Sequence, residues 1–360
     1  MPDTIAQLEA AGELQARLCR ENGSPTYEAV IKALVAQLAE PLAATRLLRD
    51  DGADPVRSAV YLRLLCAVHR VALMDPSCPL RAFYPSTGGS VDLRRVVPVF
   101  LGVVEDDVET IAAGMREPIQ TNEVGRAAPL SAALCYVAAL SGTPLRLLEA
   151  GASAGLNLWL DRYRVQAGQV AWGPPDSPLQ LVGHFASGAP PPVDLMVVDR
   201  RGCDLNPIDI GVPRSRWLLR SFVWPEHLER LDRLDRALAA ASPGPLDALD
   251  ACSWLRSQLV ELRSGATTVV LHSLLLPYLA DDERSELERL IRRAGEQADY
   301  DRRLAWVSLE PTPGYDDVLL TCESWPDGRR VRLATSTPHG TKIRWDPVPL
   351  ASPEVAGERR

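Results

Sequence analysis

The sequence lacks the features by which several classes of protein are recognised. It has no block of Lys and Arg: the basic residues are almost all Arg, they are spread along the 360 residues, and the formal net charge is −8. Because nucleic acids and anionic membranes are bound through clustered Lys and Arg, we expect neither as the main partner. No window approaches the roughly 18 apolar residues that a membrane-spanning helix needs. The N-terminus has no basic segment followed by an apolar one, so we expect no signal peptide and a cytoplasmic protein.

Closely spaced cysteines and histidines are also missing. The seven Cys are far apart, their number is odd, and no pair has CxxC spacing. This argues against a disulfide framework and a zinc knuckle, and it favours buried free thiols in a reducing compartment. The five His show no metal-ligand spacing, so we expect no metal site.

What is present is typical of a globular protein with two parts. Hydrophobic residues make up 46% and charged residues 24%, which predicts a packed core. The first third reads as helical, because "YEAVIKALVAQLAEPLAATRLLRD" and "VRSAVYLRLLCAVHRVALM" place apolar residues at i, i+3, i+4 and i+7. The segment "DLRRVVPVFLGVVEDDVETIAAGM" follows, and we expect Pro98 to interrupt it, since proline cannot donate in a helix interior.

From Leu145 onward, short apolar runs alternate with helical stretches. The runs "LRLLEA", "DLMVVDRRGCDL", "TTVVLHSLLL" and "RLAWVSLE" predict strands buried on both faces of a doubly wound α/β sheet. "DVLLTCESW" and "RRVRLATST" are separated only by "PDG", which predicts an antiparallel hairpin. The segment "QAGQVAWGPPDSPLQLVGHFASGAPPPV" is an irregular insertion with room for a small hairpin. The predicted division is a helical region, 1–140, a sheet domain, 141–348, and a flexible tail, 349–360.

The stretch "LRLLEAGASAGLNLWL" places an acid, Glu149, at the end of a hydrophobic strand and small residues after it. In an open parallel sheet, ligands bind beyond the carboxyl ends of strands where the strand order reverses. Gly151 permits a tight turn and Gly155 lets a helix, expected from near Ala154, lie close to the strand. The dinucleotide fingerprint G-x-G-x-x-G is incomplete here, and an acid beside it opposes a pyrophosphate. A cationic or hydroxyl-bearing ligand suits the acid better.

This pattern resembles the first motif of class I S-adenosylmethionine (SAM)-dependent methyltransferases, E/D-x-G-x-G-x-G, with Ser153 in place of one glycine. The resemblance covers residues 145–345. It implies a Rossmann-like methyltransferase fold, a mostly parallel seven-stranded sheet with a C-terminal antiparallel hairpin, behind an N-terminal all-helical region that forms a lid or substrate pocket. It also implies SAM as cofactor, bound by a set of residues near the strand ends. That set is Glu149, Gly151, Ala152, Ser153, Gly155, Asn157, Asp204 and Asp250.

Within this set, the resemblance implies particular roles for the acids. Glu149 would lie near the methionine end of the cofactor. The ribose hydroxyls would be held by Asp204 or by Asp199; the run "GCDLNP" favours Asp204. Asp250 would accept from the adenine amino group, ahead of a capping Ser253.

Two residues are candidates for proton transfer. His272 follows an apolar strand, and imidazole titrates near neutral pH, so it is either a general base or a structural histidine. Glu123 in "QTNEVGR" is the second candidate. No G-x-S-x-G elbow surrounds His272, so acyl hydrolysis is not indicated.

Polar and aromatic residues in three loops are candidates for substrate contact. Asn122 and Arg126 flank Glu123 in a loop that either covers the site or caps the next helix. In "FYPSTGG", Tyr84 and Thr87 either line a pocket or belong to a turn. Trp224 in "SFVWPEHLERL" packs either on adenine or in a hydrophobic core. The full set is Tyr84, Thr87, Asn122, Arg126, Trp224 and Tyr278.

A second resemblance spans nearly the whole chain. The segments "LLEAGASAGLNLWLDRY", "RRGCDLNPIDI", "SFVWPEHLERL", "QTNEVGR" and "PHGTKIRW" are similar to those of an uncharacterised bacterial family of unknown function. It implies the same methyltransferase-like domain behind a helical extension, without a reaction.

The resulting hypothesis is an enzyme that transfers the methyl group of SAM to a small-molecule nucleophile. One alternative is a non-catalytic protein of the same fold that binds SAM or a partner. Another is an oxidoreductase with a nucleotide cofactor. The methyl acceptor and the oligomeric state stay open.

Overall fold

The computed structural model describes residues 2–312 and 317–351. It divides into two compact units, which we describe separately. The helical unit comprises Met1–Thr121 and Val212–Asp232, and the sheet unit comprises Asn122–Gly211 and Arg233–Arg360. The predicted tail, 349–360, lies outside the described residues from 352 onward, and Pro349 still belongs to the last strand.

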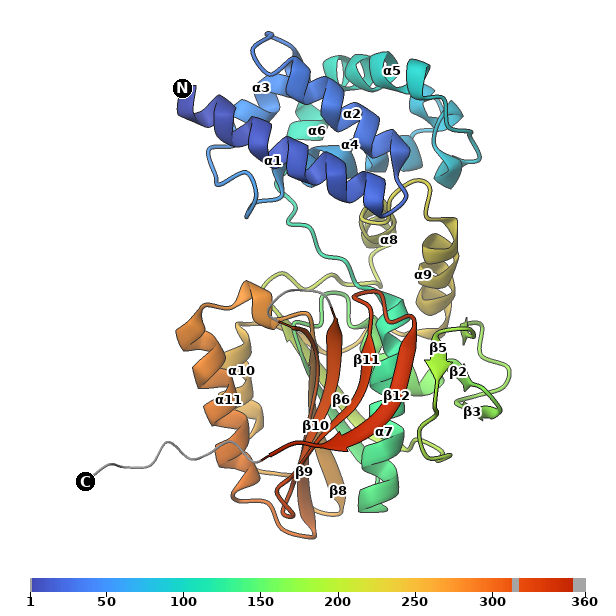
Figure 1. Ribbon diagram of the computed structural model, residues 1–360, viewed down its shortest axis with the longest axis vertical. Helices are drawn as coiled ribbons and strands as arrows, with labels where there is room; N and C mark the ends of the chain where they lie inside the picture. Colours follow the sequence, from blue (N-terminus) through green and yellow to red (C-terminus); the bar gives the residue numbers. More distant parts are fainter. Residues whose placement is uncertain (1, 313–316, 352–360) are drawn as a thin grey trace, which may run out of the picture. The chain divides into compact units, whose positions relative to one another are not determined.

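The helical unit surrounds one apolar core (Figure 1). Two of the helices described below begin at a capping side chain: Ser24 accepts from Tyr27 N ahead of α2 (Pro25–Ala36), and Asp92 accepts from Arg94 N and Arg95 N ahead of α5 (Leu93–Asp106). The elements are α1 (Pro2–Glu21), α2 (Pro25–Ala36), α3 (Ala43–Arg49), α4 (Val60–Met74), η1 (Pro79–Ala82), η2 (Pro85–Thr87), α5 (Leu93–Asp106), α6 (Val108–Gly114) and α8 (Pro213–Ser221).

Pro98 does not interrupt its helix, contrary to the sequence prediction. α5 continues through it to Asp106, and a separate short helix, α6, follows. The Pro98 side chain is exposed, while Val96, Phe100 and Val103 of the same helix are buried. The hydrogen bond lost at proline therefore falls on the solvent side, where water replaces it, and burial of the apolar face keeps the helix together.

The sheet unit is built on nine strands in the order β5-β12-β11-β10-β9-β8-β1-β6-β7. Neighbouring strands from β7 to β9 are parallel, and β9 to β12 form an antiparallel meander. The strands are β1 (Leu145–Ala150), β5 (Phe185–Ser187), β6 (Val197–Asp204), β7 (Leu246–Ala248), β8 (Ala266–Ser273), β9 (Arg302–Pro311), β10 (Val318–Trp325), β11 (Arg329–Ser336) and β12 (Ile343–Pro349).

The sheet has more strands than predicted, although the β10–β11 hairpin is confirmed. The sequence missed β5, which is three residues long, and β12, which contains Pro347 and Pro349. Proline is tolerated in a strand only where no neighbour needs its N–H. β12 meets β5 only at Ile343 and Arg344, so the rest of β12 is an edge.

The insertion after β1 forms a second, three-stranded sheet of β2 (Arg164–Ala167), β3 (Val170–Trp172) and β4 (Gln180–Leu181). β2 and β3 are the small antiparallel hairpin for which the sequence left room, and Gly168 takes φ +59° in its turn.

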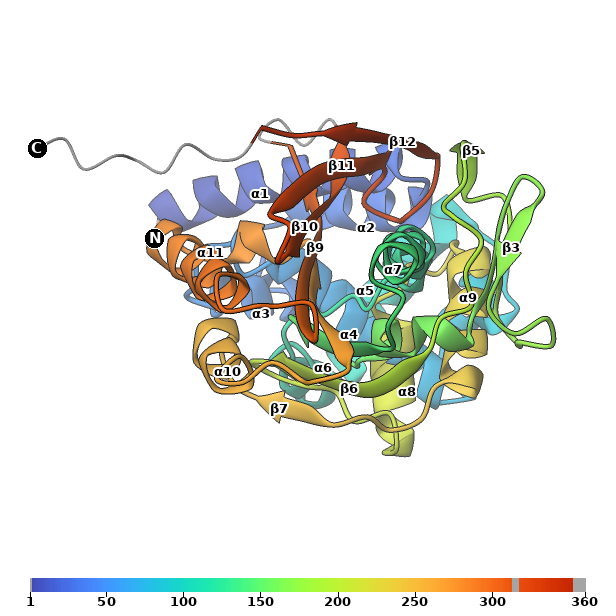
Figure 2. The ribbon, with the colours of Figure 1, turned by 90° about the horizontal axis from the view of Figure 1, so that it is seen from below.

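Helices cover both faces of the large sheet. α7 (Ala127–Ser141) packs on β9, β10 and β11, whereas α10 (Ala251–Gln258) packs on β1 and β6, and α11 (Asp281–Gly295) packs on β9. Figures 1 and 2 show α7 on one side of the sheet and α10 with α11 on the other. The remaining helices are η3 (Val124–Arg126), η4 (Leu156–Arg162), α9 (Leu228–Ala240) and η5 (Leu276–Tyr278).

α7 also corrects the expectation that no segment is apolar enough to cross a membrane. Within the described residues, Val124–Ser141 has sufficient length and hydropathy, and 72% of it is buried inside the protein. A helix that is apolar on all sides is expected between a sheet and its other neighbours. All seven Cys are free thiols, buried except for the half-buried Cys252, as predicted.

Candidate functional site

The strand order reverses at β1. The chain passes from β1 to β6 and β7 on one side and then returns to place β8 and β9 on the other side. The carboxyl ends of β1 and β8 therefore flank the crevice in which ligands of open α/β sheets bind. Glu149 lies opposite Leu271 of β8 at this edge.

The loop after β1 is held in an unusual backbone conformation. Gly151, Ser153 and Gly155 have φ of 71°, 53° and 70°. Glycine adopts such values freely, but at Ser153 they cost energy and persist only when neighbours enforce them. Asp204 supplies that restraint, since its Oδ2 accepts from Ser153 N at 2.9 Å. The loop also lies against β6, where a Cβ added to Gly202 would come within 2.8 Å of the Ala152 Cβ.

No helix of ordinary length follows this loop, contrary to the prediction of one starting near Ala154. The segment Leu156–Arg162 is a 3₁₀-helix with a kink at Trp159, whose φ of −102° and ψ of 15° are not helical. Gly155 in the left-handed region precedes it and delays the first helical residue to Leu156.

Glu149 is a buried acid whose carboxyl is only partly satisfied. It is 2% exposed, and the Asn157 side chain is hydrogen-bonded to it. Burial raises the pKa of the Glu149 carboxyl to about 8, against the lowering effect of the Asn157 hydrogen bond. Glu149 Oε2 has no hydrogen-bond partner, and neither has Ser153 Oγ or Asn157 Oδ1. A buried polar group without a partner costs roughly 1–3 kcal/mol, so three of them between the end of β1 and the start of η4 are typical of a place where a ligand binds.

The two acids considered for the ribose lie at opposite ends of β6. Asp204, its last residue, accepts from Ser153 N and, through Oδ1, from Asn206 N at 2.9 Å. Asp199, near the other end, pairs with Arg146 at 3.2 Å and Arg263 at 4.0 Å. Asp204 is therefore the acid beside the loop, and Asp199 belongs to an ion-pair group at the far edge of the sheet.

Asp250 caps a helix two strands away from β1. It follows β7, and its Oδ1 accepts from Ser253 N at 2.8 Å at the start of α10. Hydrogen bonds from Ser253 hold the pKa of the Asp250 carboxyl below its usual value. The sequence had assigned the cap to Ser253, whereas the carboxylate of Asp250 is the capping group.

The "QTNEVGR" loop lies beside the same edge. Asn122 Oδ1 accepts from Leu156 N at 3.0 Å, which ties this loop to the one after β1. Arg126 donates from Nε to the carbonyl of Pro338 at 2.9 Å and from Nη1 to the carbonyl of Ser273 at 3.4 Å. Its charge lowers the pKa of Glu149, so Arg126 lies within electrostatic reach of the site.

Glu123 is engaged in structural contacts. Its Oε1 accepts from Gly125 N at 3.1 Å and pairs with Arg233 at 3.5 Å, and its Oε2 contacts His339 Nδ1 at 3.1 Å. Its side chain is almost fully buried. A general base needs an accessible lone pair within reach of the substrate, and these contacts occupy both oxygens.

His272 is also fully engaged, which does not favour the role of general base considered above. The ring is completely buried; Nε2 accepts from Trp306 Nε1 at 3.0 Å. Because the indole can only donate, the proton of a neutral His272 is on Nδ1, which donates to Glu310 Oε1 at 2.6 Å. Glu310 also accepts from the backbone N–H groups of Leu275 and Leu276.

Sequence reasoning missed Glu310, although a signal was present. Like Glu149 and Asp204, it is an acid at the carboxyl end of a buried strand. Through its contacts it fixes the segment after β8, and that segment places Leu275 over the loop. A Cβ added to Gly151 would lie 2.9 Å from Leu275 Cδ1.

Three of the expected substrate residues belong to the helical unit. Tyr84 is completely buried, with its ring edge-on to His69, and Thr87 Oγ1 donates to the carbonyls of Arg81 and Tyr84. Trp224 packs on the core of this unit, with its ring 6.1 Å from that of Tyr27. These contacts favour the turn, not a pocket, for Tyr84 and Thr87, and the hydrophobic core, not adenine, for Trp224. Tyr278, in η5 of the sheet unit, is 85% exposed.

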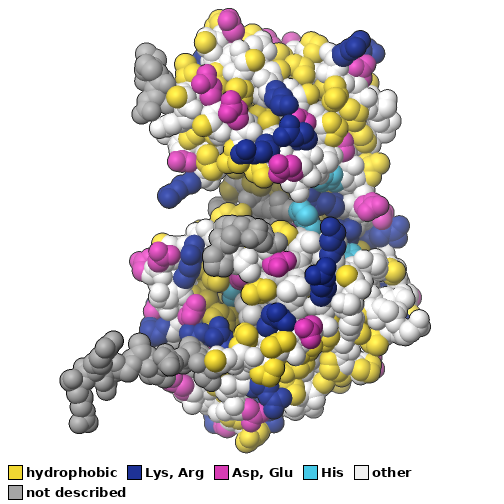
Figure 3. Space-filling model, viewed as in Figure 1, with side chains coloured by type: hydrophobic (Ala, Val, Ile, Leu, Met, Phe, Trp, Pro, Cys, Tyr) yellow, Lys and Arg dark blue, Asp and Glu magenta, His cyan; other side chains and the backbone are white. Residues whose placement is uncertain are grey.

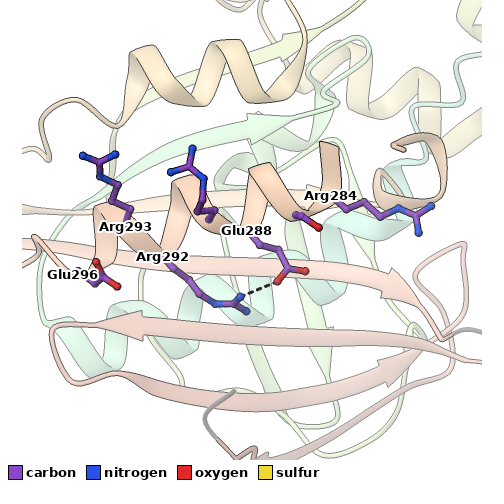
Figure 4. Close-up of a pocket in the computed structure, with 7 residues that line it drawn as sticks. Arg284, Glu288, Arg292, Arg293 and Glu296 are labelled. Carbon is purple, nitrogen blue, oxygen red and sulfur yellow. Dashed lines mark hydrogen bonds and ion pairs between the residues drawn. The ribbon is translucent and has the colours of Figure 1, made fainter. Parts of the chain in front are cut away.

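A separate hollow of 540 Å³ lies on the surface of α11. Figure 4 shows its lining of Arg and Glu side chains, among them Arg292, which pairs with Glu288 at 2.8 Å. None of the expected site residues lines it. On the face in Figure 3, the described Lys and Arg side chains of the sheet unit lie among Asp and Glu side chains.

The candidate site thus gathers Glu149, Ser153, Asn157 and Asp204, with Asn122 and Arg126 beside them. None of the curated proteins matches this chain. A family described as "uncharacterized protein conserved in bacteria (DUF2332)" matches residues 9–345, nearly the whole length, and the chain belongs to that family.

Proposed function

We propose that this protein binds SAM at the carboxyl ends of β1 and β8 and transfers its methyl group to a small-molecule nucleophile. The observation that carries the proposal is the group of three buried oxygen atoms without partners, on Glu149, Ser153 and Asn157. They lie in a strained loop at the switch point of the sheet, where both strain and unsatisfied polar groups are typical of functional sites.

The chemistry of these atoms fits SAM. Glu149 Oε2 and Asn157 Oδ1 are acceptors, and Asp204 brings a second carboxyl to the same loop. Apart from its carboxylate, SAM offers an ammonium group, a sulfonium, two ribose hydroxyls and an adenine amino group, all of which are cationic or can donate. Leu275 adds an apolar wall over Gly151. Two acids beside the loop disfavour a dinucleotide, whose pyrophosphate is anionic, so the oxidoreductase alternative is the weaker one.

The residues of the chain would act by holding and orienting. SAM supplies an activated methyl group when bound. Asn157 fixes the Glu149 carboxyl, Asp204 holds the loop through Ser153 N, and Asn122 holds its far end through Leu156 N. Fixing two reactants in line and excluding water accounts for a large part of the acceleration of such reactions.

The contacts of His272 and Glu123 do not favour either residue as the general base. Since both side chains are buried in structural hydrogen bonds, neither is proposed as the base. An acceptor that is already a good nucleophile at neutral pH, such as a thiolate or an amine, suits this site. The same observation favours the second candidate function, a protein of this fold that binds SAM without turnover.

Calorimetric titration tests the proposal. We expect micromolar binding of SAM and of its demethylated product, S-adenosylhomocysteine, and none of NAD(P). Asp204→Asn should weaken binding at least tenfold. Asp199→Asn is the matched control, because it changes the same residue type at the other end of β6, and its affinity should equal that of the wild type. Absence of SAM binding by the folded wild-type protein, or equal effects of the two variants, would contradict the proposal.

Turnover separates the two functions. Incubation of the protein with methyl-labelled SAM and a panel of small thiols, amines and phenols should yield labelled product if the chain is a methyltransferase. Binding of SAM with no labelled product from any acceptor class would support the non-catalytic alternative.

A further inference from the structure

The Glu149 carboxyl is buried, and the one cation that acts on it among the described residues, Arg126, does so through its charge. Its hydrogen-bond partner is the neutral side chain of Asn157, and Oε2 has no hydrogen-bond partner among the described residues. A buried carboxylate without a cation is costly, and a protein commonly avoids the cost by retaining the proton.

The two charged groups near Glu149 shift its pKa in opposite directions. Asp204, at the end of β6, raises the pKa of Glu149, and Arg126, in η3, lowers it. Asn157, from η4, is neutral and hydrogen-bonded to it. Tyr163, after η4, is buried and donates its hydroxyl proton to the carbonyl of Leu156 at 2.6 Å, so it adds no charge. Burial is the largest effect, and at neutral pH it leaves a carboxylic acid.

We propose that the site exchanges the proton of Glu149 for the cationic group of its ligand. Without ligand, Glu149 is a neutral acid; when an ammonium or sulfonium group occupies the position facing Oε2, the O–H bond breaks, the carboxylate remains with the cation, and the proton leaves to the solvent. Taking SAM as that cation rests on the proposed function, whereas the protonated state of Glu149 does not.

This exchange gives the site a means of selecting charge. Cationic ligands gain the attraction of a buried carboxylate, which is stronger than that of an exposed one. Their affinity should rise by up to about tenfold per pH unit below pH 8, where Glu149 must lose its proton on binding. Above pH 8 this rise ends, and a ligand held through an α-ammonium group should bind more weakly, because that group loses its own proton. A neutral nucleoside such as adenosine does not ionise Glu149, so its affinity should not change over this range.

Calorimetry in phosphate and in Tris measures the protons released. At pH 7 we expect close to one proton released per SAM bound, few at pH 9, and none for adenosine. S-adenosylhomocysteine, which keeps the ammonium but lacks the sulfonium, identifies the group: release with both ligands assigns the ammonium, and release with SAM alone assigns the sulfonium. Glu149→Gln keeps the size of the side chain but has no ionisable carboxyl, so SAM binding to this variant should release no proton. SAM binding without proton release, or equal release by Glu149→Gln, would overturn the inference.

Infrared difference spectroscopy on the ligand-free protein measures the protonation state of Glu149 without SAM. The spectrum of the wild type minus that of Glu149→Gln should contain the carbonyl band of a protonated acid at pH 7 and lose it above pH 9. If SAM fails to bind while this band is present, the proposed function fails and the protonated state of Glu149 stands. If the band is absent at pH 7, the exchange is excluded.

Discussion

At the scale of single residues, the protonation of Glu149 links the site to stability. In the unfolded chain its carboxyl ionises near pH 4.5, whereas in the folded protein burial holds its pKa at about 8. Between these values the folded state binds more protons than the unfolded state, so the contribution of Glu149 to stability is present below pH 4.5 and is lost as the pH rises toward 8.

Replacement of Glu149 by Gln should remove this pH dependence. Each pKa unit corresponds to about 1.4 kcal/mol, so the stability of Glu149→Gln relative to the wild type should increase by on the order of 4 kcal/mol from pH 4.5 to pH 8. Urea unfolding of the ligand-free proteins at pH 5, 6.5 and 8 measures it. Parallel profiles for the two proteins would show that Glu149 is ionised in the fold.

Tyr84 gives a second prediction at this scale. Its hydroxyl is buried without a partner. Tyr84→Phe should therefore leave the free energy of unfolding unchanged or raise it by up to about 1 kcal/mol, because no hydrogen bond is lost. Thermal unfolding checks this.

Tyr61 is the matched control for Tyr84 in the same helical unit. It is equally buried, but its hydroxyl donates to the carbonyl of Leu8 at 3.0 Å. Tyr61→Phe should destabilise by roughly 1–2 kcal/mol, since it leaves that carbonyl unpaired. If Tyr84→Phe cost as much as Tyr61→Phe, its hydroxyl would have a partner, such as bound water or substrate.

At the scale of elements, Glu310 connects β9 to β8 and to the segment after it. It accepts from His272 and from two backbone N–H groups, those of Leu275 and Leu276. The segment in turn places Leu275 against Gly151. Glu310 thus acts on the candidate site as a positioning residue, two strands away from β1.

Glu310→Ala should destabilise the protein by roughly 2–4 kcal/mol, because one buried donor and two partly buried ones lose their acceptor. It should also weaken ligand binding by displacing Leu275. Chemical denaturation with circular dichroism measures the first effect. Glu296→Ala, at an exposed position directly after α11, should stay within about 0.5 kcal/mol of the wild type. A loss below 1 kcal/mol for Glu310→Ala would mean that water replaces the carboxylate there.

Elements also show what the sequence could predict. β1 and β8 were predicted because strands buried on both faces are continuous apolar runs, and their polar ends, Glu149 and His272, stand out. β6 was also predicted as a strand, but the expectation that it is buried on both faces was wrong: most of its residues are partly exposed. β12 was missed because its prolines oppose a strand unless it lies at an edge, and only the pairing partners reveal an edge. The short 3₁₀ segment after Gly155 was read as a longer helix, because the apolar spacing is the same in both.

At the scale of the whole molecule, the chain enters the helical unit twice. Val212–Asp232 belongs with the first 121 residues, although the sequence predicted a single boundary at 140. The contacts that bring it there join distant positions: His69 Nδ1 with the carbonyl of Ser221, and Glu226 with Ser24 Oγ at 2.8 Å. The amphipathic pattern of this segment predicts that it is buried, but the pattern does not identify the core in which it is buried.

The hydrogen-bond partners of the side chains could likewise not be predicted from the sequence. His272 looked equally suited to catalysis and to structure until Trp306 and Glu310 were placed on its two nitrogens. Conversely, Glu149 could be chosen as a candidate from the sequence, because it is an acid directly after an apolar run, and it is buried in the structure.

A crystal structure of the protein grown with S-adenosylhomocysteine tests the account most directly. We expect the ligand at the carboxyl ends of β1 and β8, with its ammonium group within hydrogen-bond distance of Glu149 and its ribose at Asp204. Ligand bound elsewhere, or a loop between Glu149 and Gly155 that stays closed by its own side chains beside saturating ligand, would contradict it.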